Sequence, residues 1–153
     1  MCYTNIRPTN TKRKIFYKVV IEILNEGIWS VFTGIKYEIG REYQAKYMAR
    51  NPHRNKNEWW KTRVHSPIDK SHKEIIGFGL FGNVRDARTY MNNLTTYERR
   101  RSSVEYKIAK VKGENVKYRA NIGYIFYFYD RHQIRSLTCY LAKKMTILKI
   151  LED

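Results

Sequence analysis

The sequence predicts an α+β fold, in which a mainly antiparallel sheet carries one or two packed helices and a long basic loop. Three observations support this class. β-branched and aromatic segments recur along the chain, one segment has strongly helical spacing, and a stretch with two prolines, several asparagines and many cations separates them. A chain of 153 residues fits one domain with a buried core. We therefore expect a basic N-terminal arm at 1–14 and a single α+β domain at 15–153, with the long basic loop at 44–73.

Two strands joined by a tight turn are expected first. Residues 15–24 (IFYKVVIEIL) are mostly β-branched and aromatic, a composition that favours strands, and 28–33 (IWSVFT) repeat it. Between them, Asn25-Glu26-Gly27 predicts a hairpin turn, because glycine adopts the positive φ that such turns require. Short strands are expected next at 37–39 and 42–43.

A helix is predicted after Asn83, a favourable N-cap residue that is followed by Asp86 at the positive end of the helix. The apolar residues that follow have the spacing of one buried helix face; they are Ala87, Tyr90, Met91 and Leu94. We expect this helix to end near 92–93.

The C-terminal half is expected to hold more strands. Val104 to Val111 alternate between apolar and polar residues, Gly113-Glu114-Asn115 predict a turn, and 116–119 would be the returning strand. The apolar run at 123–129 (GYIFYFY) is typical of a buried central strand. Residues 137–151 fit either element, and we favour a short helix followed by a terminal strand. The helical spacing rests on Leu137, Leu141, Met145 and Leu148.

Charge is the most unusual property of the chain. Thirty Lys and Arg residues against fourteen Asp and Glu give a formal net charge of +16 and a pI near 9.9. A field of this size attracts nucleic acid, anionic membranes or acidic proteins. The 13 Tyr, 6 Phe and 3 Trp residues fit two kinds of partner, since rings stack on bases and also anchor protein interfaces.

Cysteine content and hydropathy indicate the compartment. Cys2 and Cys139 are too few for a small secreted domain stabilised by disulfides, so we expect a reducing environment. The N-terminus lacks the apolar run of a signal peptide, and no segment approaches the ~20 apolar residues of a membrane span. We therefore expect no membrane insertion and no secretion by a signal peptide; the oligomeric state stays open.

Two short motifs resemble known sites, and we interpret both as structural. Gly77 to Gly82 match the glycine spacing of a dinucleotide-binding loop, but bulky neighbours and the absence of a parallel βαβ pattern favour a strand and turn beneath the helix. Glu105-Tyr106-Lys107 resemble the end of a metal-dependent nuclease motif. Such a site needs a second acid, and Asp86 is expected to lie too far away.

The histidines and cysteines indicate no further site. His53, His65 and His72 lie in the long loop, without the hairpin and helix that a histidine-containing metal nuclease requires. The two cysteines lack zinc-ligand spacing. Cys139 and His132 could be drawn as nucleophile and base, but a buried thiol and a surface imidazole are the simpler interpretation. We therefore expect no enzyme, no cofactor and no metal centre.

Three basic segments are candidate surfaces for an acidic partner: the N-terminal arm, the long loop and the run at 99–101. A cationic run is often only a solvated face, but three of them with few acids favour binding. Trp59 and Trp60 lie beside Lys61, where one ring can anchor the loop and the other can stack on a partner. The predicted partner-binding residues are Lys12, Arg13, Lys14, Arg50, Arg54, Lys56, Trp59, Trp60, Lys61, Arg63, Arg99, Arg100 and Arg101.

Several short segments carry a family resemblance: 1–4 (MCYT), 7–9 (RPT), 16–20 (FYKVV), 30–33 (SVFT), 37–40 (YEIG), 77–81 (GFGLF), 104–110 and 145–148 (MTIL). Together they resemble a set of small uncharacterised basic proteins of large DNA viruses and phages, over most of the chain. Gly79 departs from that pattern, in which histidine is frequent, so we expect none of the chemistry that such a histidine would carry. The resemblance implies a viral source and brings no established activity.

Charge and resemblance together lead to two expected functions. The first is a virion structural component, a minor capsid-type protein that contacts acidic capsid proteins or genome surfaces. The second is a nucleic-acid-binding protein with little sequence preference, since no groove-reading motif is evident. A metal-dependent nuclease is a third and less favoured alternative. These functions place the protein in the virion, or in the cytoplasm or nucleus of an infected cell.

Overall fold

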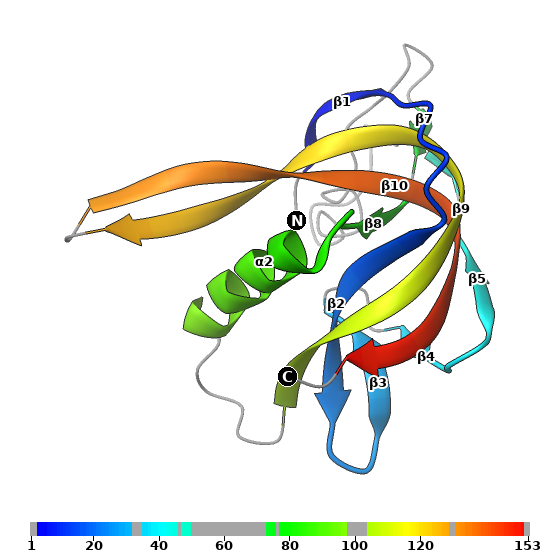
Figure 1. The fold of residues 1–153 in the computed structure, drawn as a ribbon, viewed down its shortest axis with the longest axis horizontal. Coiled ribbons are helices and arrows are strands. Elements are labelled where there is room, and N and C mark those ends of the chain that lie inside the picture. The colour runs from blue at the N-terminus through cyan, green and yellow to red at the C-terminus, as the bar shows by residue number, and fades with distance from the viewer. Residues whose placement is uncertain are drawn as a thin grey trace.

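The computed structural model describes residues 3–31, 35–45, 47–49, 73–75, 77–97, 104–128 and 131–151, and these are mainly β-strand (Figure 1). The main sheet contains β1 (Tyr3–Pro8), β2 (Ile15–Ile23), β3 (Gly27–Ser30), β4 (Lys36–Tyr37), β5 (Glu42–Gln44), β8 (Phe78–Leu80), β9 (Val104–Phe128) and β10 (Arg131–Leu151). β6 (Tyr47–Ala49) and β7 (Lys73–Ile75) pair as a separate two-stranded sheet. The described residues contain one helix, α2 (Val84–Tyr97). The predicted α+β class, with one or two packed helices, is therefore wrong: the fold is a mainly antiparallel, curled half-barrel sheet.

β9 and β10 form the centre of this sheet as one long hairpin. Their pairing runs from Phe128 and Arg131 to Ile108 and Leu151, and the strand order is β4-β3-β2-β9-β10-β5. β2 pairs with the first part of β9, and β1 pairs with a later part of the same edge. β8 and β5 pair with successive parts of the free edge of β10. The hairpin thus pairs directly with β1, β2, β5 and β8, and β2 connects it to β3 and β4 (Figure 1).

β8 also links β10 back to β2. Phe81, directly after β8, exchanges two backbone hydrogen bonds with Tyr17 of β2, at 2.7 and 2.8 Å. β2, β9, β10 and β8 therefore enclose a small interior. The residues predicted to form a basic N-terminal arm lie beside it: β1 pairs with β9, and the carbonyl of Lys14 accepts a 2.9 Å hydrogen bond from the Gly113 amide.

The predicted turn at Gly113-Glu114-Asn115 is wrong, because β9 continues through these residues. Asn115 has φ 55°, and the β9–β10 register shifts between Leu141 and Ala142, so the strand bends instead of reversing. Gly113 is required at this bend. A Cβ there would lie 2.9 Å from Phe16 Cδ2 and 2.9 Å from Leu80 Cδ1, inside the enclosed core. The same residue types that favour a turn here allow a long strand to bend tightly.

The short helix predicted within 137–151 is also wrong, since β10 is extended from Arg131 to Leu151. Pairing with β9 along almost its whole length supplies the backbone hydrogen bonds, and β-branched residues such as Thr138 and Ile147 suit that conformation. The run predicted as a buried central strand forms the far end of β9, where it pairs only with β10. Gly123 is exposed there.

The first hairpin and the start of the helix are confirmed. Asn25 and Gly27 have φ of 62° and 88° in the turn between β2 and β3, and the Glu26 amide bonds the Ile23 carbonyl at 2.9 Å. Asn83 caps α2: its Oδ1 accepts a 2.8 Å hydrogen bond from the Asp86 amide. The helix continues to Tyr97, beyond the predicted end.

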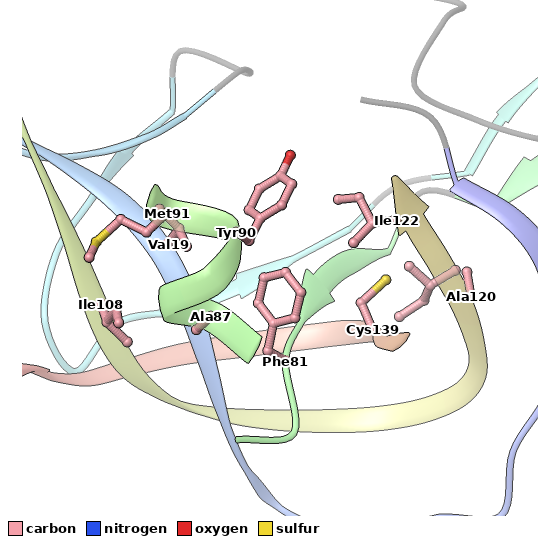
Figure 2. Packing of buried hydrophobic residues seen from close by; sticks show 10 residues of the cluster. Val19, Phe81, Ala87, Tyr90, Met91, Ile108, Ala120, Ile122 and Cys139 are labelled. Carbon is pink, nitrogen blue, oxygen red and sulfur yellow. The ribbon is translucent and has the colours of Figure 1, made fainter. Parts of the chain in front are cut away.

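Two buried cores hold the fold together. The first joins α2 to the sheet (Figure 2) and contains Val19, Phe81, Ala87, Tyr90, Met91, Ile108, Ala120, Ile122, Cys139 and Leu141. The second lies within the curl of the sheet and contains Phe16, Val20, Tyr37, Leu80, Ala109, Val111, Ala142, Met145 and Ile147. Neighbouring residues such as Ile108 and Ala109 belong to different cores, as strand alternation requires. The sheet is therefore packed on both faces near its centre.

A candidate polyanion-binding face

Most of the predicted partner-binding residues lie outside the described part of the chain: Arg50, Arg54, Lys56, Trp59, Trp60, Lys61, Arg63, Arg99, Arg100 and Arg101. The exposed residues Lys12, Arg13 and Lys14 lie within it, between β1 and β2. The Arg13 guanidinium donates a hydrogen bond to the Gly82 carbonyl, next to the start of α2. Backbone contacts thus hold this short segment against the sheet, and it borders a second group of lysines that the sequence analysis did not select.

This group lies on the outer side of the bent hairpin. Val111 and Ile147 are opposite each other and fully buried in the core within the curl. Because side chains alternate along a strand, Lys110 and Lys112 lie on the other face of β9. Three consecutive cross-strand pairs of β9 and β10 lie on this face: Lys110 with Lys149, Lys112 with Thr146, and Glu114 with Lys144. We call Lys14, Lys110, Lys112, Lys144 and Lys149 the lysine face.

Two acids partly balance these five lysines. Lys112 Nζ lies 2.9 Å from Glu114 Oε1, a contact that raises the pKa of Lys112 and lowers that of Glu114. Lys14 and Lys144 also lower the pKa of Glu114, so three lysines share this carboxylate. Glu42 of β5 lies opposite Thr146, at the border of the face. The charge of the face therefore remains positive.

Lys110 and Lys149 are the pair on the lysine face whose positive charge is least offset by acidic residues. They are directly opposite each other on adjacent strands, and neither forms an ion pair with another residue in the described part of the chain. Like charges in such cross-strand positions destabilise a sheet. Lys149 is exposed and Lys110 is half-buried, so both side chains reach the surface. A bound phosphate group would convert this repulsion into attraction.

Sequence reasoning missed this face because it depends on register. Lys110 and Lys112 lie on the polar side of an expected strand, but Lys144 and Lys149 fall in the segment predicted to contain a helix. Only the continuous β9–β10 pairing brings the four together. The available signal was a set of lysines at two- and five-residue intervals in two segments rich in β-branched residues.

The glycine motif serves packing. Gly77 to Gly82 span β8, and a Cβ at Gly77 would lie 2.7 Å from the Leu141 Cβ. The centroids of the Phe81 ring and the Tyr90 ring of α2 are 5.5 Å apart. Figure 2 shows the two rings next to each other. The interpretation of this motif as a strand and turn beneath the helix is therefore confirmed.

The remaining catalytic motifs find no supporting geometry among the described residues. Glu105 pairs with Lys107 at 3.3 Å, and no group of three or more His, Cys, Asp and Glu side chains gathers in that part of the chain. Cys139 is buried beneath α2, and burial raises the pKa of its thiol to about 12, although nearby Lys18 opposes the shift. His132 lies seven residues away along the same strand.

Lys18 is a further cation, half-buried on β2. It lies on β2 opposite Ala109, between the fully buried Phe16 and Val20, and burial lowers its pKa to about 8. No ion pair links it to another described residue. It adds a destabilising charge to the core region and is not part of the lysine face.

Comparison with known proteins gives no matching family model and no curated protein or solved structure with significant similarity. No helix among the described residues is long and apolar enough to cross a membrane.

Proposed function

We propose that this chain is a non-catalytic binding protein whose lysine face contacts the phosphates of a nucleic acid. The observation that carries the proposal is the directly opposed pair Lys110 and Lys149, which no described acid neutralises. A protein gains nucleic-acid affinity mainly by replacing the counterions condensed on phosphates with its own cations. Four lysines on one pleated surface, with Lys14 beside it, provide several such contacts.

The face suits binding without sequence recognition. Lys110 and Lys149 are about 5 Å apart across the strands, and Lys110 and Lys112 are about 7 Å apart along β9. Lysine is a point charge that does not fix the orientation of its partner as the arginine fork does. We therefore expect affinity that depends steeply on salt and little on base sequence.

A virion structural role remains the alternative. In that case the lysine face would contact an acidic capsid surface, and the viral origin implied by the sequence resemblance supports this reading. The two functions differ in their preferred polyanion. A nucleic-acid-binding protein prefers phosphates over carboxylates at equal charge, whereas a face that docks on an acidic protein also accepts polyglutamate.

The test is a binding titration with duplex DNA, single-stranded DNA, duplex RNA and polyglutamate across a salt series. The informative variant is Lys110→Gln with Lys149→Gln. Its control is Lys36→Gln with Arg85→Gln, which removes the same charge from β4 and α2. We expect the first variant to reduce the slope of log affinity against log salt by about two, and the control by much less. Equal losses in both variants, or preferential binding of polyglutamate, would contradict the proposal.

A further inference from the structure

The far ends of β9 and β10 form a two-stranded ribbon that projects beyond α2 (Figure 1). It comprises 123–128 of β9 and 131–136 of β10, paired from Gly123 with Ser136 to Phe128 with Arg131. The last contact of β1 with β9 is at Ile122, and β8 contacts β10 only from Tyr140 onward. In the described part of the chain, the ribbon therefore has no third strand on either edge.

Both faces of the ribbon carry exposed residues near its base, although Tyr124 is half-buried and packs against the first core. Gln133, Ile134, Arg135 and Ser136 are exposed in succession, and alternation places them on opposite faces. Ile134 is 80% exposed, although it is one of the larger apolar side chains. A two-stranded ribbon is only marginally stable in water on its own. A partner that surrounds the ribbon would cover this apolar surface and stabilise the pairing.

The two strands of the ribbon and its base contain no acid, although Asp130 falls between the strands in the sequence. Residues 117–128 and 131–142 include Lys117, Arg119, Arg131 and Arg135, and neither range contains Asp or Glu. β1, which flanks the base, contributes Arg7 directly opposite Arg119. The partner is therefore expected to be anionic along the strands of the ribbon and its base.

We propose that this ribbon enters the major groove of duplex DNA. The major groove of B-form DNA is about 12 Å wide and admits a two-stranded antiparallel ribbon. Its walls would cover both faces of the ribbon, and Arg135 would contact phosphates or a guanine edge from its exposed position on β10. Ile134 offers an apolar surface for a thymine methyl group. The inference rests on the proposed function and adds the form of nucleic acid and the groove.

Two other partners fit the ribbon less well. An acidic protein strand would add to one edge through backbone hydrogen bonds and would leave both faces exposed. Duplex RNA is A-form, and its major groove is too deep and narrow for side chains to read. The exposed residues on both faces of β10, from Gln133 to Ser136, favour B-form DNA.

A matched pair of variants tests the inference on the full-length chain. The ribbon variant is Ile134→Ala with Arg135→Ala. Its control is Leu24→Ala with Arg85→Ala, which removes an equally exposed apolar side chain (74%) and an exposed arginine elsewhere. Each protein is titrated with a 16-base-pair DNA duplex and the RNA duplex of the same sequence. We expect the ribbon variant to lose about tenfold in DNA affinity, and RNA affinity and the control to stay within about twofold.

A groove-specific measurement on the wild-type protein is independent of any substitution. Bound protein should protect guanine N7, in the major groove, from methylation by dimethyl sulfate, and should leave adenine N3, in the minor groove, reactive. Protection of adenine N3 alone would overturn the inference. So would equal losses on DNA and RNA, or a ribbon variant that binds DNA normally but loses polyglutamate binding. If the wild-type protein binds no duplex at low salt, the proposed function fails as well.

Discussion

Lys110 and Lys149 lie directly opposite each other on β9 and β10, on the face of the hairpin that points away from the core within the curl. The arrangement places two like charges in directly opposite positions on adjacent strands, beside the register shift between Ile147 and Lys149. Such a pair opposes folding in the free protein and favours binding of an anion. Stability and affinity should therefore respond in opposite directions when one of the charges is removed.

Replacing Lys149 by glutamine should show this opposition. Removal of the repulsion is expected to stabilise the free protein by on the order of 0.5 kcal/mol. The same change should weaken binding to duplex DNA and reduce the salt slope by about one. Thermal unfolding without ligand and a titration at several salt concentrations measure the two effects. A variant that loses both stability and affinity would indicate that Lys149 is structural.

The bend of β9 at Gly113 should tolerate no side chain. Gly113→Ala places a Cβ against Phe16 and Leu80, and we expect overpacking to cost about 1–3 kcal/mol of unfolding free energy. Gly123→Ala is the control, because the nearest atom to its added Cβ is 3.8 Å away. Urea unfolding of both variants gives the comparison. Equal effects at the two positions would show that the bend does not depend on this contact.

The half-buried charge of Lys18 predicts a specific pH dependence. Its pKa is about 8 in the folded protein and near 10.5 in the unfolded chain, so the unfolded chain binds more protons between these values. This group therefore opposes folding fully below pH 8, and its cost disappears as the pH rises toward 10.5. Lys18→Met should stabilise the protein at pH 7 by about 1–3 kcal/mol.

The control for Lys18→Met is Lys117→Met, at an exposed position of β9. Unfolding free energies are measured between pH 6 and pH 10.5, and the gain of the Lys18 variant should shrink toward the upper end. A gain that does not vary with pH would mean that packing, and not charge burial, is responsible.

Cys139 should be inert in the folded protein. It is 1% exposed, and burial raises its pKa to about 12, so very little reactive thiolate is present near neutral pH. In a Cys2→Ser background Cys139 is the sole thiol. Iodoacetamide at pH 8 should leave it unmodified under native conditions and alkylate it fully in denaturant, as mass spectrometry would show. Rapid native labelling would contradict its position beneath α2.

Local signals predicted those elements whose partners are close in sequence. The β2–β3 hairpin depends on its own turn, with Asn25 and Gly27 at positive φ, and the start of α2 depends on the Asn83 cap. The apolar residues of the helix were also predicted, because their spacing alone defines the buried face. In each case the stabilising contact lies within a few residues.

The long hairpin was not predictable in the same way. Gly113 and Asn115 favour a turn, and only contacts with Phe16 and Leu80, far away in the sequence, make them a bend within a strand. The helical spacing in 137–151 led to the wrong prediction of a helix for a similar reason. Pairing with β9 outweighs the local preference of these residues for a helix. The lysine face depends on that pairing. The sequence shows each of its lysines, but it does not show that they lie on one face.

The most direct test of the lysine face is lysine protection by bound DNA. Reductive methylation with formaldehyde and a borohydride, with and without a saturating DNA duplex, reports by mass spectrometry which amines become shielded. We predict strong protection of Lys110, Lys112, Lys144 and Lys149, and unchanged labelling of Lys36, which lies on β4 away from the face. Protection elsewhere, with Lys110 and Lys149 still fully labelled, would contradict the central claim that this face binds the phosphates.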